Sequence, residues 1–287
     1  MLSLDKWLLL TGTLAYMAAL ITTLIRLARR REPLHGTNLI LILGGWLIQT
    51  AGLWMIGMTA RQCPIRNPFE VFQFVSWSII ILWLFTGQVF RLSLFGAGCA
   101  TLAAIISFLS FLMPGLDGSV AAGSQLAGNP RVDAHAALAL FSYGIFGLLA
   151  VLSALYLLQN KSLKSKRWAG IFRYLPSLVE MDTVLLRLLI MACVIYTISI
   201  GIGALYWIEN MDHLSMAKIV FTTALWVAYW IVLILRASNR LFGTRLAWTC
   251  LCLLVAALLI LWPVEASRMN KDLALVLCSL PIIRNVD

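Results

Sequence analysis

Charged residues are scarce in this chain of 287 residues. Only 12% of the residues are charged, about half the share found in a soluble domain, whereas 61% are hydrophobic and the mean hydropathy is +0.92. Apolar stretches of about 20 residues recur along the whole length, and each can cross about 30 Å of hydrocarbon. This composition excludes a soluble globular protein and predicts an all-α, polytopic transmembrane helical bundle.

Several sequence motifs of catalysis are also missing. The six cysteines form no CxxC or CxxCH, which excludes a thioredoxin-type redox motif and covalent attachment of a c-type haem. The chain contains neither a P-loop nor HExxH, so nucleotide hydrolysis and zinc proteolysis have no support. We therefore assign no covalent catalysis and expect that the protein is not an enzyme.

The apolar pattern predicts about eight spans in a single transmembrane domain covering residues 1–287. The spans are about 5–27, 39–58, 70–90, 92–113, 135–158, 183–206, 219–236 and 244–262. Lys and Arg gather in alternate loops, so the positive-inside rule predicts that both termini lie outside. The net charge of +10 then reflects orientation and contact with anionic membrane lipid, and no nucleic-acid partner is expected.

The stretch "QCPIRNPFEVFQFVSW" (62–77) concentrates polar residues before the third span. Asn67 is predicted to be the N-cap of this span, with Pro68 at its first and Glu70 at its third helical position. Glu70 has a second candidate partner in Arg66, four residues earlier. Both interpretations make the stretch a helix entry on the outer face.

Only three histidines are present, and two of them fall at the predicted outer face. His135 opens the fifth span, and His213 lies in the loop before the seventh. Two imidazoles on one face can supply both axial ligands of a haem iron, although ordinary interfacial histidines fit the same pattern. The aromatic start of the third span, including Trp77, suits either a porphyrin face or plain helix packing.

The stretch also resembles a family motif. Pro64, Asn67, Glu70, Phe74 and Trp77 fit the Pro-x-x-Asn-x-x-Glu-x-x-x-Phe-x-x-Trp pattern of the cytochrome c assembly family, and the similarity extends over about residues 35–262. The resemblance implies a role in c-type cytochrome assembly, with haem handled at the outer face of a bacterial cytoplasmic (inner) membrane. Other cytochrome c maturation proteins are the implied partners.

Departures from the family pattern indicate which branch of the family the chain resembles. The chain has no WWD segment, and the family's two intramembrane histidines align with Gln49 and with about Ile234. It therefore resembles the HemX- and YpjD-like branch more closely than the CcsA-like one. The resemblance implies haem iron bound by His135, with His213 as a possible second ligand.

Trp77, Trp207 and the Asn67/Glu70 turn would surround this haem. Two other functions stay open. One is a HemX-like regulatory membrane protein of haem biosynthesis that acts through protein contacts at the inner basic loops. The other is a small-molecule transporter, in which the buried Gln49 and Gln73 would line a path.

Overall fold

The structure is a computed structural model that describes residues 3–29, 35–90, 93–112, 129–165, 177–209 and 216–259. These residues form helices and no strands. Seven helices are long and apolar enough to cross a membrane, and a shorter apolar one, Thr244–Leu259, follows them. The seven are α1 (Leu4–Ala28), α2 (His35–Ala60), α3 (Pro68–Phe90), α4 (Ser93–Leu112), α5 (Pro130–Ser165), α7 (Leu178–Glu209) and α8 (Met216–Ala237). The predicted all-α membrane fold is confirmed.

Most helices extend past their predicted bounds by one to four residues, and α5 and α7 extend furthest. Helix α5 covers Pro130–Ser165 instead of 135–158, and α7 covers Leu178–Glu209 instead of 183–206. Polar caps explain both early starts: Asn129 Oδ1 accepts the Arg131 amide N–H at 3.0 Å, and Ser177 and Glu180 cap each other's backbone amides. Residues 260–262 of the last predicted span lie outside the described residues.

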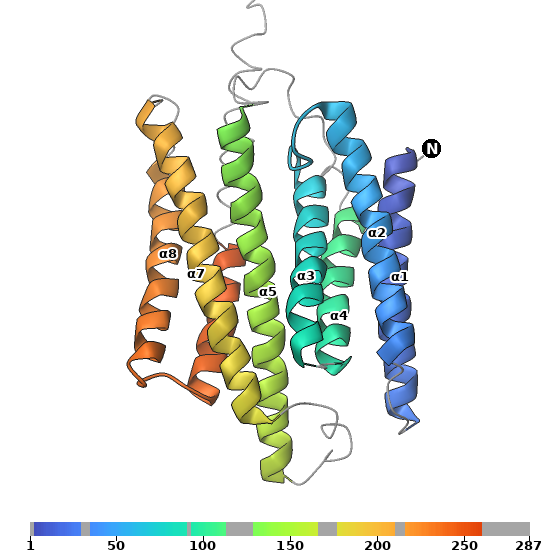
Figure 1. Cartoon of the computed structure of the whole chain (residues 1–287), viewed down its shortest axis with the longest axis vertical. Helices are drawn as coiled ribbons and strands as arrows, with labels where there is room; N and C mark the ends of the chain where they lie inside the picture. Colours follow the sequence, from blue (N-terminus) through green and yellow to red (C-terminus); the bar gives the residue numbers. More distant parts are fainter. Residues whose placement is uncertain are drawn as a thin grey trace, which may run out of the picture.

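The helices run roughly side by side and alternate in direction (Figure 1). Helices α1 to α4 form one half of the bundle and α5, α7 and α8 the other, and α5 joins the halves by packing on α3 and α4. Helices α2, α4 and α7 end, and α3, α5 and α8 begin, at the same end of the bundle. We call this the His135 end, because His135 lies in the second turn of α5.

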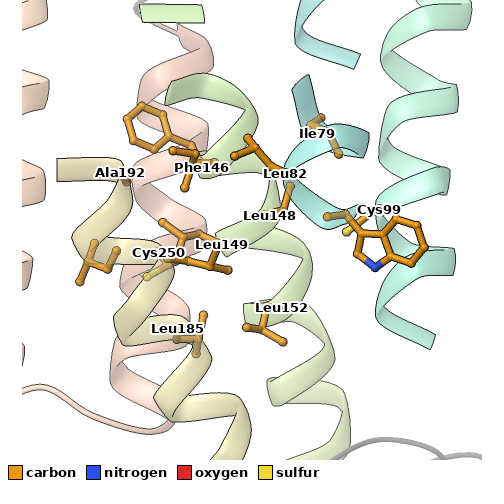
Figure 2. Close-up of a cluster of buried hydrophobic side chains, with 14 of the residues drawn as sticks. Ile79, Leu82, Cys99, Phe146, Leu148, Leu149, Leu152, Leu185, Ala192 and Cys250 are labelled. Carbon is orange, nitrogen blue, oxygen red and sulfur yellow. The ribbon is translucent and has the colours of Figure 1, made fainter. Parts of the chain in front are cut away.

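The centre of the core is the middle of α5. Figure 2 shows Leu148, Leu149 and Leu152 of α5 between Ile79 of α3 and Leu185 of α7. All five side chains are fully or almost fully buried. This packing fixes α5 relative to both halves, and it therefore fixes the position of the residues that α5 carries at the His135 end.

Candidate functional site

The connection from α2 to α3 is held by its own polar groups. Asn67 Oδ1 accepts the Glu70 amide N–H at 2.8 Å, which confirms Asn67 as the N-cap. Glu70 Oε2 accepts the Arg66 amide N–H at 2.8 Å, and Glu70 Oε1 pairs with the Arg66 guanidinium at 2.6 Å. Glu70 therefore has both of the roles that the sequence suggested for it. Glu70 is only 3% exposed, so the carboxylate that fixes this turn is buried.

The same turn packs against the first turns of α5. Ile65 and Val71 form a buried cluster with Leu140, and Cys63 and Ala136 pack against that cluster. Burial, together with the smaller effects of the nearby Asp133 and Glu70 carboxylates, raises the pKa of the Cys63 thiol to about 11. The family-motif turn therefore supports α5 directly beside His135.

His135 turns to the opposite side, toward α7. Its Nδ1 lies 2.7 Å from the carbonyl oxygen of Ser199. A carbonyl oxygen only accepts, so Nδ1 carries a proton and donates in this contact. The Ser199 hydroxyl donates to the His135 carbonyl oxygen at 2.9 Å, which makes the contact reciprocal. The half-buried imidazole is thus oriented by α7.

Gly203 makes this contact possible. It lies four residues after Ser199, and a side chain at that helical position would overhang the Ser199 carbonyl, because Cβ bonds tilt toward the helix N-terminus. A Cβ on Gly203 would lie 2.7 Å from His135 Nδ1 and 2.8 Å from Cε1. Sequence reasoning missed Ser199 and Gly203, although a glycine inside a membrane span is a signal of close approach.

Trp77 belongs to a different part of the molecule. Its Nε1 donates to Thr50 Oγ1 of α2 at 2.8 Å, and its ring stacks on Trp46 and contacts Phe74. Trp77 also lines a cavity of about 280 Å³ between α2 and α3. Since His135 contacts α7 and is not among the residues lining this cavity, the structure does not bring these two predicted site residues together.

The remaining predicted site residues are less fully described. Trp207 lies in the last turns of α7, at the His135 end, but its side chain is outside the description. His213 lies outside the described residues. Among the residues that the structure does describe, no group of three or more His, Cys, Asp or Glu side chains is arranged to hold a metal ion.

Gln49 and Gln73 bond to each other instead of facing a cavity. Gln49 Nε2 donates to Gln73 Oε1 at 2.9 Å, and Gln49 Oε1 accepts the Tyr16 hydroxyl at 2.8 Å. Gln73 Nε2 donates to Ser110 Oγ at 2.8 Å, and Ser107 Oγ donates to Gln73 Oε1 at 3.0 Å. These five side chains are at most 3% exposed and connect α1, α2, α3 and α4. Their geometry offers no support for a transport path.

Comparison with known proteins agrees with the motif. The family model for the cytochrome C assembly protein matches residues 65–265, which include the turn, His135, Ser199 and Gly203. The chain belongs to this family. It is therefore a membrane protein of the cytochrome c biogenesis type, and its resemblance to the family is confirmed.

Individual relatives point to the HemX branch. The chain is 30% identical over 161 residues to Protein HemX of Brevibacillus brevis, covering 56% of this chain and 58% of that relative. It is 24% identical over 213 residues to Protein HemX of Bacillus subtilis (strain 168), covering 73% and 77%. It is 31% identical over 131 residues to Cytochrome c biogenesis protein CcsA of Cyanidium caldarium, covering 42% and 43%. The match thus spans less than two thirds of the first of these relatives.

Proposed function

We propose that this protein is an assembly factor for c-type cytochromes that handles haem at the outer membrane face, with His135 as an axial ligand. The observation that carries the proposal is the hydrogen bond from His135 Nδ1 to the Ser199 carbonyl at 2.7 Å. Histidines that ligate metals commonly donate their other ring N–H to a carbonyl or carboxylate, which fixes the tautomer and increases the basicity of the ligating nitrogen. In this proposal the contact orients the ring, and Nε2 would bind the iron.

The residues at the His135 end would have separate roles in binding haem. His135 would supply the ligating nitrogen and Ser199 would orient it, while the turn around Asn67 and Glu70 supports α5 from the other side. His213 is the proposed second ligand, and Trp207 is a proposed neighbour of the haem. Haem itself would supply an iron with two axial positions for nitrogen ligands. Membrane lipid and other maturation proteins are the proposed partners.

The distribution of charge supports an outer location for His135. Basic residues gather at the end of the bundle opposite to the His135 end. This basic end holds Arg26, Arg29, Lys161, Lys164, Arg236, Arg240 and Arg245. Because short cytoplasmic segments are rich in Lys and Arg, we propose that the basic end faces the cytoplasm of a bacterium and that both termini lie outside.

The test is an absorption spectrum of protein purified from haem-replete cells. We expect a Soret band in the wild type and its loss in His135→Ala. The matched control is His35→Ala, because His35 opens α2 at the opposite end of the bundle (Figure 1). A haem-free wild type, or equal spectra for the two variants, would overturn the proposal.

The basic end favours one second candidate, a regulatory membrane protein of haem biosynthesis acting through protein contacts. Arg240 and Arg245 are exposed there and are available to an acidic partner. In that case the wild type is haem-free, and replacing Arg240 and Arg245 by Gln changes haem synthesis in cells whereas His135→Ala does not.

A further inference from the structure

The cavity between α2 and α3 has no role in the haem proposal. It holds about 280 Å³ and is lined by Thr50, Leu53, Trp54, Gly57, Met58, Pro64, Phe74 and Trp77. The α2 residues lie on one face of the helix, and from Thr50 to Met58 they extend about 12 Å along its axis, at a rise of 1.5 Å per residue. Trp54 and Met58 are 67% and 65% exposed, so the cavity opens on the outside of the bundle.

The lining side chains offer a ligand few hydrogen bonds. Thr50 has the only side-chain hydroxyl, and that group donates to the Trp46 carbonyl oxygen at 2.7 Å. The same hydroxyl accepts the Trp77 indole N–H at 2.8 Å, so the indole nitrogen of Trp77 also has its hydrogen-bond partner. The remaining side chains are aliphatic or aromatic, and their polar atoms are the Met58 thioether and the indole N–H of the exposed Trp54. Such a cavity favours hydrocarbon, because most polar groups that entered it would lose their water without finding a partner.

A cation with an unusual backbone lies in the connection that carries the lining residue Pro64. Arg61 lies midway in sequence between two lining residues, Met58 and Pro64, and has φ 54°. The Gln62 amide N–H donates to the Gly57 carbonyl oxygen at 3.3 Å, so α2 ends in a Schellman motif with Arg61 at the left-handed position. Glycine is the usual residue there, because a Cβ strains this conformation. Arg61 is exposed and occupies a position that favours glycine. This suggests that the charge of its side chain serves to bind a ligand.

We propose that this cavity binds one acyl chain of an anionic phospholipid whose net negative headgroup is held by Arg61. The charge of Arg61 selects the headgroup, and the walls formed by Trp54, Phe74 and Trp77 take the chain. Arg66 is the other cation of this turn, but it is paired with Glu70. The proposal does not depend on haem binding.

The experiment measures lipid retained by the full-length protein. Protein is extracted from bilayers with equal phosphatidylglycerol and phosphatidylcholine and examined by native mass spectrometry. Gly57→Leu fills the cavity, since a Cβ there meets only ordinary contacts at 3.4 Å and 3.6 Å. Its matched control is Gly44→Leu on the same helix, where a Cβ has nothing within 4 Å. We expect bound phosphatidylglycerol to fall about five-fold or more in Gly57→Leu and to stay unchanged in Gly44→Leu.

The headgroup contact has its own pair of variants. We expect Arg61→Gly to remove the preference for phosphatidylglycerol while raising the thermal stability of the protein, because it relieves the backbone strain. Arg61→Lys keeps the charge and should retain the preference. Equal lipid retention by the two leucine variants would overturn the proposed cavity site. Equal binding of both lipids by the wild type would overturn the headgroup assignment, and loss of a Soret band instead of lipid in Gly57→Leu would make the cavity a porphyrin site.

Discussion

At the scale of single residues, the lack of a side chain at Gly203 leaves room for the His135 imidazole. We predict that Gly203→Ala breaks the bond from His135 Nδ1 to the Ser199 carbonyl, because the new Cβ would lie 2.7 Å from Nδ1. In haem-free protein labelled with ¹⁵N-histidine, the wild type should show His135 as the Nδ1–H tautomer. The alanine variant should show a mixture of tautomers.

Gly201 provides the control on the same helix. A Cβ at Gly201 meets nothing within 4 Å, so Gly201→Ala should leave the histidine spectrum unchanged. Because the measurement needs no haem, it tests the positioning of His135 separately from haem binding. Identical spectra for Gly203→Ala and the wild type would show that the ring does not depend on this contact.

The Cys63 thiol gives a second prediction at this scale. Since the pKa is raised to about 11, little thiolate exists at pH 8, and thiolate is the form that is alkylated. In a variant retaining Cys63 alone, the rate with a membrane-impermeant maleimide should rise about ten-fold per pH unit between pH 7 and pH 9. Asp133→Asn removes one negative neighbour and should accelerate labelling at every pH in this range. Labelling that occurs only from the cytoplasmic side would contradict the proposed orientation.

At the scale of elements, the helix starts depend on polar caps. Asn67→Ala removes the acceptor of the Glu70 amide N–H and should lower the free energy of unfolding by about 1 kcal/mol, as for other N-cap substitutions. Asn67→Ser keeps an oxygen at the cap and should cost less. Thermal unfolding of both variants in one detergent measures the difference. Equal losses for the two variants would mean that the cap oxygen contributes nothing.

The caps also show how far the sequence alone could lead. The pair Asn67–Pro68 predicted the start of α3, and the equivalent pair Asn129–Pro130 marks the start of α5. The predicted start at 135 was late because hydropathy detects the apolar part of a helix, and the first turns of α5 contain Arg131 and Asp133. The same bias hid the Ser177–Glu180 capping box of α7.

The site was harder to predict than the helices. His135 stood out as a rare residue type, but Ser199, its partner, lies 64 residues away in the sequence. No local pattern specifies such a contact, because it depends on how α5 packs on α7. Trp77 was grouped with His135 on its aromatic character and the family motif, whereas the α3 face that carries Trp77 packs on α2.

At the scale of the whole molecule, one apolar core extends through both halves of the bundle. Helices α1 to α4 share in addition the hydrogen-bond network of Gln49 and Gln73. Glutamine at the place of a family histidine thus has a structural role here. Lipid hydrocarbon is as apolar as the side chains of the helices, so the hydrophobic effect does not drive these helices together in a membrane. The hydrogen bonds of Gln49 connect them instead.

This role can be measured with a double-mutant cycle on Tyr16 and Gln49. Gln49→Leu leaves the fully buried Tyr16 hydroxyl without its acceptor and should lower the free energy of unfolding by about 1–3 kcal/mol. In the Tyr16→Phe background the same change should cost less, by about 0.6 kcal/mol, a typical coupling for such pairs in a membrane protein. Unfolding in mixed micelles with increasing dodecyl sulfate gives all four free energies. If the glutamines instead lined a hydrated path, water would replace the lost partner, and the cost of Gln49→Leu would be the same in both backgrounds.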